Sequence, residues 1–243
     1  MHRFYLDESR DDFLLPEDAR HALTVLRMKK GDFLEAFLNG QRFQAEIVEI
    51  AGDAVQIRRL APLPSTEPAL RITLFQGLPK ADKMEWIVQK AVELGVDRVI
   101  PVLMRRCVVQ WKAADAVRKL ERWNRIAREA CKQSGRCRIP EVSAPVALDR
   151  IAPLLASQSA NAVPWEEADG LGPAAFAQAH PELDSLGILI GPEGGIDPEE
   201  MESLRREGCT PLTLGPRILR TETAGLAAIS AFMALYGEME GNR

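Results

Sequence analysis

Hydrophobic and polar residues alternate along much of the first sixty positions, a pattern typical of strands with one buried face. The run Phe33–Leu38 leads into Asn39-Gly40, a dipeptide typical of two-residue hairpin turns, and Arg42–Ile50 alternates on the far side. A second turn at Gly52-Asp53 precedes another short alternating run. Within Pro16–Met28 the apolar residues recur at helical spacing instead. These patterns predict a small β-rich unit with one short helix.

The segment Ala61–Pro68 holds three prolines in eight residues and reads as a linker. We therefore predict two domains, residues 1–66 and residues 70–243. Beyond the linker, strands alternate with helices. The predicted strands are Leu70–Gln76, Arg98–Leu103, Gly187–Ile190 and Pro211–Leu214, and the predicted helices are Asp82–Leu94, Ala113–Ser134, Pro198–Glu207 and Thr223–Tyr236. This alternation indicates an α/β domain around a mostly parallel sheet, in which ligands bind beyond the carboxyl ends of the strands.

Composition excludes several classes of protein. The chain has 243 residues, of which 46% are hydrophobic and 27% charged, as in ordinary soluble globular proteins. Four cysteines without C-x-x-C spacing and only three histidines argue against a disulfide scaffold and against a zinc site. The chain starts without the apolar run of a signal peptide, and its longest apolar stretch, Ala224–Tyr236, is too short to span a bilayer. We expect a soluble, cytoplasmic protein that binds no membrane and no metal.

Charge is distributed unevenly along the chain, although the net charge is only −4. Residues 71–140 carry 16 lysines and arginines against 7 acidic residues, whereas residues 141–243 carry 6 against 16. The basic middle segment is suited to an anionic partner, for which nucleic acid is the usual candidate. It could equally neutralise the acidic C-terminal segment within the protein. Charge alone leaves both interpretations open.

The first loop suited to ligand binding is Gly191–Gly195, with the sequence Gly-Pro-Glu-Gly-Gly, between a predicted strand and a predicted helix. Its three glycines let the backbone approach a ligand closely, and N–H groups there and at the helix start suit a polar or anionic group. No Gly-Lys-Ser/Thr follows, so the loop is not a P-loop. For such a loop in isolation, a tight turn without any ligand is the more common explanation.

The second such loop runs from Leu214 to Ala224 and leads into an apolar helix, which Thr221 or Thr223 could cap. It presents Arg217 and Arg220 from a segment that a strand and a helix hold in place. These arginines either belong to a ligand site or are exposed and paired, with Glu222 as the obvious partner of Arg220.

A third feature is the predicted helix Ala113–Ser134, whose basic residues recur at three- and four-residue steps along one side. They are Arg118, Arg122, Arg125, Arg128 and Lys132, and Arg105, Arg106, Lys112 and Arg136 extend the row. Such a face is commonly just solvated. Because only Glu121 and Glu129 dilute it, we favour a phosphate-binding surface.

Seven motifs together resemble a known family. They are His2-Arg3-Phe4-Tyr5; His21-x3-Val25-Leu26-Arg27 with Gly31-Asp32; Lys83-Met84-Glu85-Trp86; Lys90-Ala91-x-Glu93-Leu94-Gly95; Glu129-Ala130-x2-Gln133-Ser134-x-Arg136; Gly191-Pro-Glu-Gly-Gly195; and Leu214-Gly215-x-Arg217-Ile218-Leu219-Arg220-x-Glu222-Thr223-Ala224. In their order and in their residues, these motifs resemble those of the bacterial 16S rRNA (uracil-N3)-methyltransferases over nearly the whole chain. The last two motifs are highly specific as a pair.

The resemblance implies a PUA-like β-barrel for RNA recognition, followed by a SPOUT domain in which the chain forms a deep trefoil knot. Knotted chains are rare, and periodicity alone would not suggest one. The resemblance further implies a homodimer with its site near the subunit interface. The cofactor would be S-adenosyl-L-methionine, and the reaction would be methylation of N3 of a uridine in the 16S rRNA of the small ribosomal subunit.

Site residues follow from the matched motifs and from the strand ends beside them. The expected cofactor-binding residues are Leu74, Gln76, Trp165, Gly191, Pro192, Glu193, Gly194, Gly195, Leu214, Gly215, Ile218, Leu219, Arg220, Thr223 and Ala224. Because uridine N3 must lose a proton before it attacks, a cation or a general base is needed. Arg136 and Arg220 are the candidate cations; Glu222 is the candidate base, or else it only orients Arg220.

The expected RNA-binding residues are Arg3, Arg20, Arg27, Arg105, Arg106, Arg122, Arg125 and Arg136. In the barrel, Arg20 and Arg27 would form a local basic patch with Lys29 and Lys30 despite the acidic balance of that domain. Two alternatives stay open: a SPOUT methyltransferase with another RNA target, and a noncatalytic RNA-binding factor for ribosome assembly on the same fold.

Overall fold

The computed structural model describes residues 1–109, 111 and 113–240, and the chain divides into two units. The first unit comprises Met1–Glu67 together with Cys131–Ile139, and the second comprises Pro68–Ala130 and the residues from Pro140 onward. The division between Glu67 and Pro68 lies inside the proline-rich segment. Residues 131–139 differ from expectation, because the predicted domains place them in the second unit and the structure places them in the first.

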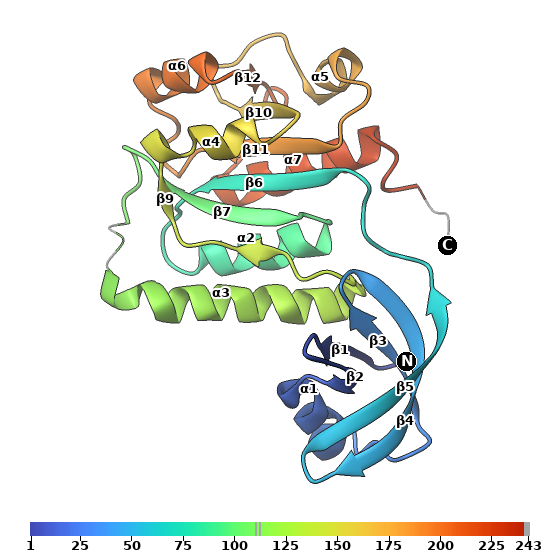
Figure 1. Cartoon of the computed structure of the whole chain (residues 1–243). Helices are drawn as coiled ribbons and strands as arrows, with labels where there is room; N and C mark the ends of the chain where they lie inside the picture. The colour runs from blue at the N-terminus through green and yellow to red at the C-terminus, as the bar shows by residue number, and fades with distance from the viewer. Residues whose placement is uncertain (110, 112, 241–243) are drawn as a thin grey trace. The chain divides into compact units, whose positions relative to one another are not determined.

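The first unit is a closed five-stranded barrel in the order β1-β2-β5-β4-β3 (Figure 1). Its strands are β1 (Arg3–Asp7), β2 (Arg10–Leu14), β3 (Phe33–Leu38), β4 (Gln41–Ala51) and β5 (Ala54–Leu63). The predicted β3–β4 hairpin is confirmed: Leu38 pairs with Gln41, and both turn residues, Asn39 and Gly40, have positive φ (49° and 76°). Positive φ at both positions is the geometry that the Asn-Gly dipeptide favours. Parallel pairing of β1 with β3 then closes the barrel.

The helix predicted over Pro16–Met28 is shorter and changes type along its length. It begins as α1 (Pro16–Arg20) and continues as a single π-helical segment, η1 (His21–Val25). Arg27 then adopts a left-handed conformation with φ 54°, so a right-handed helix cannot continue through it. Ala19 and Ala22 are buried against the apolar interior of the barrel.

The second unit is built on a seven-stranded parallel sheet with the main order β12-β10-β11-β6-β7-β8 and with β9 also paired to β7 (Figure 1). The strands are β6 (Arg71–Gly77), β7 (Arg98–Leu103), β8 (Glu141–Val142), β9 (Val146–Ala147), β10 (Ala160–Pro164), β11 (Ser185–Ile190) and β12 (Cys209–Leu212). The predicted mostly parallel sheet is confirmed. β12 lies two residues earlier than predicted, and it tolerates Pro211 because it is an edge strand.

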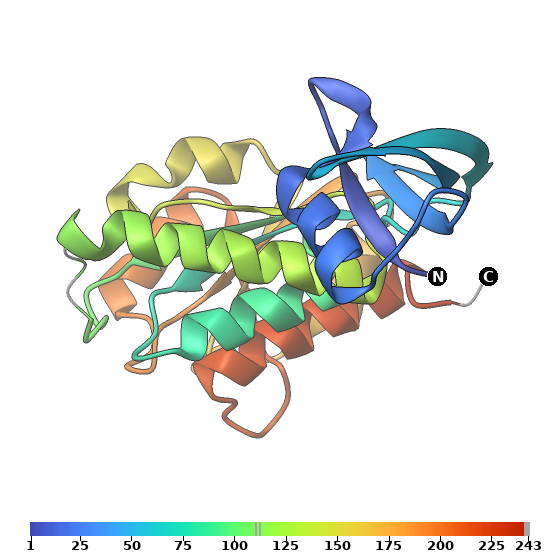
Figure 2. The ribbon, with the colours of Figure 1, turned by 90° about the horizontal axis from the view of Figure 1, so that it is seen from below.

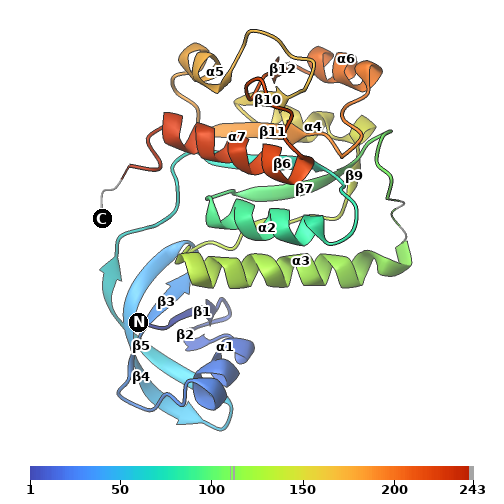
Figure 3. The ribbon, with the colours of Figure 1, turned by 180° about the vertical axis from the view of Figure 1, so that it is seen from behind.

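Helices cover both faces of this sheet. They are α2 (Lys83–Glu93), α3 (Ala113–Ser134), α4 (Ala152–Ala156), α5 (Pro173–Ala179), α6 (Pro198–Arg206) and α7 (Thr221–Leu235), with a 3-10 turn η2 (Leu148–Arg150). Figures 2 and 3 show α2 and α7 side by side on one face, with α4 on the other. Because both faces are covered, the central strand β11 is buried along its whole length. The trefoil knot remains a prediction.

Two further findings concern the described part of the chain. No described helix is long and apolar enough to cross a membrane. Within the same residues, no group of three or more histidine, cysteine, aspartate or glutamate side chains could hold a metal ion.

Candidate active site

A cavity of about 850 Å³ lies at the carboxyl ends of the neighbouring strands β10, β11 and β12. Its walls come from the segments that follow these strands, including both loops singled out in the sequence, and from Lys83 of α2. The volume is within the range of small-molecule sites. Of the expected cofactor-binding residues, those that line it are Trp165, Gly191, Pro192, Glu193, Gly195, Leu214, Gly215, Ile218, Leu219, Arg220 and Ala224.

Leu74 and Gln76 do not line the cavity but lie below it in the sheet, where both are fully buried. Gln76 Nε2 donates to Thr221 Oγ1 at 2.9 Å, and that hydroxyl donates to the carbonyl oxygen of Gly191 at 2.6 Å. The expectation that Thr221 or Thr223 caps α7 is wrong, because Arg220 occupies the N-cap position and makes no side-chain capping bond. Thr221 instead ties both cavity loops to strand β6.

Close packing explains the glycines of the Gly191–Gly195 loop. A Cβ atom at Gly191 would lie 2.8 Å from a side-chain carbon of Ile196, and one at Gly195 would lie 2.1 Å from Glu166 Oε1. Gly195 also has φ +73°, a conformation that L side chains rarely adopt. Gly194 is not among the cavity-lining residues, and a Cβ there would lie 2.9 Å from Arg106 Cβ. The glycines let this loop pack closely against its neighbours.

The start of α6 was predicted as part of an anion site, but a carboxylate of the protein already binds a backbone N–H group there. The Asp197 carboxylate caps the helix by accepting from the backbone N–H of Glu199 at 3.1 Å. Arg105 pairs with both of these acidic residues, and Arg106 pairs with Asp197 and donates to the carbonyl oxygen of Gly194 at 3.2 Å. Both arginines were expected to bind RNA, and here they hold the neighbourhood of the loop in place.

Lys83, which was absent from the expected site residues, lies between two carboxylates at the cavity. Its Nζ is 3.1 Å from Glu193 Oε1 and 3.1 Å from Glu222 Oε2. The hydrogen bonds that Lys83 donates to Glu222 and then to Glu193 raise the pKa of Lys83, so it stays charged. Burial raises the pKa of Glu222, but hydrogen bonds from its own backbone amide and from Lys83 outweigh it and hold that pKa below its usual value. The signal in the sequence was the position of Lys83 at the head of the Lys-Met-Glu-Trp motif.

Arg217 and Arg220 both line the cavity and are exposed. Neither forms an ion pair with a side chain in the described ranges; the expected Glu222–Arg220 pair is replaced by Glu222–Lys83. Ile218, between the two arginines, is 87% exposed. Thr223 and Glu222 lie in the first turn of α7, outside the cavity lining. The loop therefore presents two exposed guanidinium groups to the cavity.

Other residues expected to contact RNA fall into two groups. Arg122 pairs with Glu85 at 2.6 Å, and Arg3 pairs with Glu35 and donates to backbone carbonyls at the end of α3. Arg20, Arg27 and Arg125 are exposed. The last three are the better phosphate ligands, because none of them is paired with a carboxylate among the residues described.

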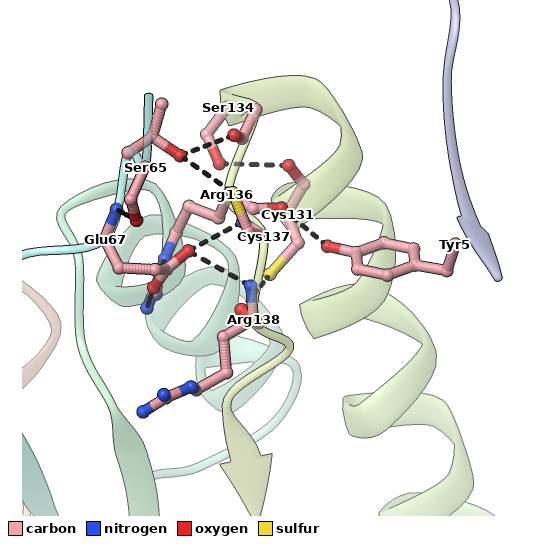
Figure 4. Close-up of polar contacts among 10 residues, drawn as sticks. Tyr5, Ser65, Glu67, Cys131, Ser134, Arg136, Cys137 and Arg138 are labelled. Carbon is pink, nitrogen blue, oxygen red and sulfur yellow. Dashed lines mark hydrogen bonds and ion pairs between the residues drawn. The ribbon is translucent and has the colours of Figure 1, made fainter. Parts of the chain in front are cut away.

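Arg136 belongs to the first unit, apart from the cavity-lining residues, and its side chain is only 5% exposed (Figure 4). Its Nε and Nη2 donate to Glu67 Oε2 at 3.2 and 2.6 Å. The other Glu67 oxygen accepts the backbone N–H groups of Cys137 and Arg138, and the Tyr5 hydroxyl donates to the carbonyl oxygen of Arg136. The geometry gives Arg136 a role in joining residues 131–139 to the barrel.

Comparison with known proteins agrees with this architecture. A family model described as an RNA methyltransferase PUA domain matches residues 14–58, and one described as an RNA methyltransferase domain matches residues 66–233. Ribosomal RNA small subunit methyltransferase E of Bacillus subtilis is 34% identical, over 93% of this chain and 91% of the relative. The protein of the same name from Mycobacterium tuberculosis is 34% identical, over 98% of this chain and 94% of the relative.

Solved structures match along the same length. Ribosomal RNA small subunit methyltransferase E of Neisseria gonorrhoeae, crystallised with S-adenosyl methionine, is 33% identical and aligns with a TM-score of 0.82, covering 98% of this chain and 99% of that one. A putative methyltransferase of Legionella pneumophila, in complex with the same cofactor, is 32% identical with a TM-score of 0.82 and covers 96% of both chains. The chain belongs to the ribosomal RNA small subunit methyltransferase E family, in which an RNA methyltransferase domain follows a PUA domain.

Proposed function

We propose that this chain methylates N3 of a uridine in the 16S rRNA of the small ribosomal subunit, with S-adenosyl-L-methionine as the methyl donor. The observation that carries the proposal is the cavity at the ends of β10, β11 and β12, in which two motif loops meet and Arg220 is exposed. The names of the relatives support the rRNA substrate, and the cofactor in two of the matching solved structures supports the donor.

The residues present suit this cofactor. Leu214, Leu219 and Ala224 supply apolar wall for an adenosine group, while Glu166 and Glu193 supply carboxylates for its hydroxyl and ammonium groups. When bound, S-adenosyl-L-methionine supplies an electrophilic methyl group. The residues of the chain then have to orient the donor, admit one uracil base and favour the loss of the proton from its N3.

In the transfer, a bond forms between uridine N3 and the methyl carbon, the bond from sulfur to that carbon breaks, and the N3 proton leaves. We assign Arg220 to stabilise the negative charge that develops on the uracil ring, because its guanidinium is exposed at the cavity and unpaired among the described residues. Glu222 is a poor proton acceptor, since its lowered pKa reflects its bond to Lys83. We therefore propose that Glu222 holds Lys83 in position and does not act as the base. The proton from uridine N3 is released to solvent.

RNA binding in this proposal depends on the exposed arginines of both units and on the PUA-like barrel, and the site of action is the cytoplasm. A homodimer is also proposed. Three exposed large apolar side chains support it: Trp86 on α2, Ile218 in the loop before α7 and Leu235 at the end of α7 are 53%, 87% and 44% exposed. Light scattering of the purified protein should give twice the chain mass, and a monomer at micromolar concentration would contradict it.

The decisive experiment mixes purified protein with labelled S-adenosyl-L-methionine and unmodified small subunits, then identifies the labelled nucleoside after digestion. We expect 3-methyluridine. Arg220→Ala should lower kcat by about a hundredfold, as loss of one charge-stabilising group commonly does. Arg206→Ala, an exposed arginine of α6 away from the cavity lining, is the matched control and should be unchanged.

Two other outcomes would overturn the assignment. Cofactor binding without a labelled uridine in the small subunit would indicate another RNA target. Absence of cofactor binding would indicate a noncatalytic RNA-binding factor on the same fold.

A further inference from the structure

Lys83 joins two segments of the active site that are far apart in the sequence. It lies in the first turn of α2, and its ammonium group contacts one carboxylate from the Gly191–Gly195 loop and one from the first turn of α7. We call Lys83, Glu193 and Glu222 the Lys83 cluster. Each of its three side chains is less than one third exposed, so the contacts are partly shielded from solvent.

The loop before α2 is shaped to support this cluster. The backbone N–H of Lys80 donates to Glu193 Oε1 at 3.0 Å, the same oxygen that Lys83 contacts. The next residue, Ala81, has φ 51°, a left-handed conformation that is costly for a residue with a Cβ atom. Such strain persists only where the surrounding contacts impose it, and it tends to mark functional segments.

The charges explain why the contact matters for the shape of the cavity. Two carboxylates that contact one ammonium group lie close to each other, and without the cation they would repel. Their repulsion would act between the Gly191–Gly195 loop and the start of α7, which form two walls of the cavity. Thr221 also links these walls through Gly191, but it is uncharged and cannot offset the two carboxylates.

We propose that Lys83 is a positioning residue, which holds the Gly191–Gly195 loop and the first turn of α7 together and thereby sets the shape of the cofactor cavity. Its effect on S-adenosyl-L-methionine rests on the proposed function, whereas its effect on the two loops does not. Lys83 touches neither reacting atom in this account and acts through Glu193 and Glu222.

The chain offers a matched control on the same helix. Lys90 of α2 forms an ion pair with Glu93 at 2.8 Å, and its side chain is 30% exposed against 31% for Lys83. Lys90→Met therefore removes a similar ion pair from a similar environment without touching a cavity loop. Lys83→Met removes the cation of the cluster, and Lys83→Arg keeps the positive charge.

The first measurement is amide hydrogen exchange of the cofactor-free protein. Lys83→Met should speed exchange in both the segment 191–195 and the segment 217–224, with peptides of β7 (Arg98–Leu103) in the same unit unchanged as evidence of intact folding. Lys90→Met should leave both segments as in the wild type. Equal exchange in the wild type and Lys83→Met would overturn the proposal, whatever the protein binds.

The second measurement is the Kd for S-adenosyl-L-methionine by calorimetry. Lys83→Met should weaken binding about tenfold, the size of coupling expected within one ionic network, and Lys83→Arg should recover most of it. Adding Glu193→Gln and Glu222→Gln to Lys83→Met should also recover part of the affinity, because the repulsion is then gone. If wild-type protein does not bind the cofactor, the proposed function fails, and the exchange result still decides the role of Lys83.

Discussion

Replacing Glu67 by alanine should strongly destabilise the first unit. Glu67 accepts two hydrogen bonds from the Arg136 guanidinium and two from the backbone N–H groups of Cys137 and Arg138. The Arg136 side chain is 5% exposed and that of Glu67 14%, so water replaces these bonds poorly. Removing one partner of a buried ion pair costs about 3 kcal/mol or more. The lost backbone bonds add about 1 kcal/mol each, and access of water on the Glu67 side offsets part of the sum. We expect Glu67→Ala to lower the free energy of unfolding of the first unit by about 3 kcal/mol in total.

The assay is urea unfolding with two probes, since the two units need not unfold together. All four tryptophans (Trp86, Trp111, Trp123 and Trp165) lie in the second unit, so their fluorescence reports on that unit alone. Hydrogen exchange of barrel peptides reports on the first. Glu67→Ala should lower the urea midpoint of the barrel and leave the fluorescence transition nearly unchanged.

A matched control tests the reasoning about burial. Glu46 pairs with Arg58 in the same barrel, but the Arg58 side chain is 63% exposed. Glu46→Ala should cost less than about 1 kcal/mol, as surface pairs do. A cost for Glu67→Ala as small as that for Glu46→Ala would refute the view that residues 131–139 are anchored to the barrel by this carboxylate.

Two more predictions concern the cofactor and the RNA. Gly195→Ala should weaken S-adenosyl-L-methionine binding in calorimetry, because it strains the backbone at φ +73° and its Cβ would displace the carboxylate of Glu166, a cavity-lining residue; Gly208→Ala strains the backbone similarly (φ +81°) but outside the cavity lining, and should bind normally. Arg125→Glu should weaken binding to small subunits across a salt series and lower the salt slope by about one, as loss of a phosphate contact does. Arg122→Glu should weaken binding to small subunits less than Arg125→Glu does, since Glu85 already neutralises Arg122. Equal loss of affinity in the two variants would contradict the view that pairing with Glu85 decides the difference.

Local sequence was sufficient wherever neighbouring residues decide the conformation. The Asn39-Gly40 turn, with positive φ at both residues, set the β3–β4 hairpin as predicted. Helix α2 was predicted at Asp82–Leu94 and observed at Lys83–Glu93, because its apolar face repeats with helical period and Gly95 ends it. Both cavity loops were recognised from their motifs and from their position after strands of a parallel sheet.

Contacts between segments that are distant in the sequence could not be predicted from local sequence patterns. Strands β1 and β2 carry no clear alternation that would predict them, and β1 is placed by pairing with β3, which lies some thirty residues later. The helix predicted over Pro16–Met28 ends at Val25, and its residue types do not signal the left-handed conformation of Arg27 that prevents its continuation. Trp165 was expected at the cavity and lines it, but its indole nitrogen is buried without a hydrogen-bond partner among the residues that the structure describes, which no pattern indicates.

The sequence by itself determined the two-part organisation, the parallel α/β sheet, the family and the loops that form the cavity, because turn chemistry, periodicity and motifs are properties of neighbouring residues. Only the tertiary structure decided which charges are paired. Arg136 joins Glu67 in the first unit, and Glu222 joins Lys83 rather than the adjacent Arg220. An ion pair depends on distance and burial, and residues remote in sequence acquire both only when the chain has folded.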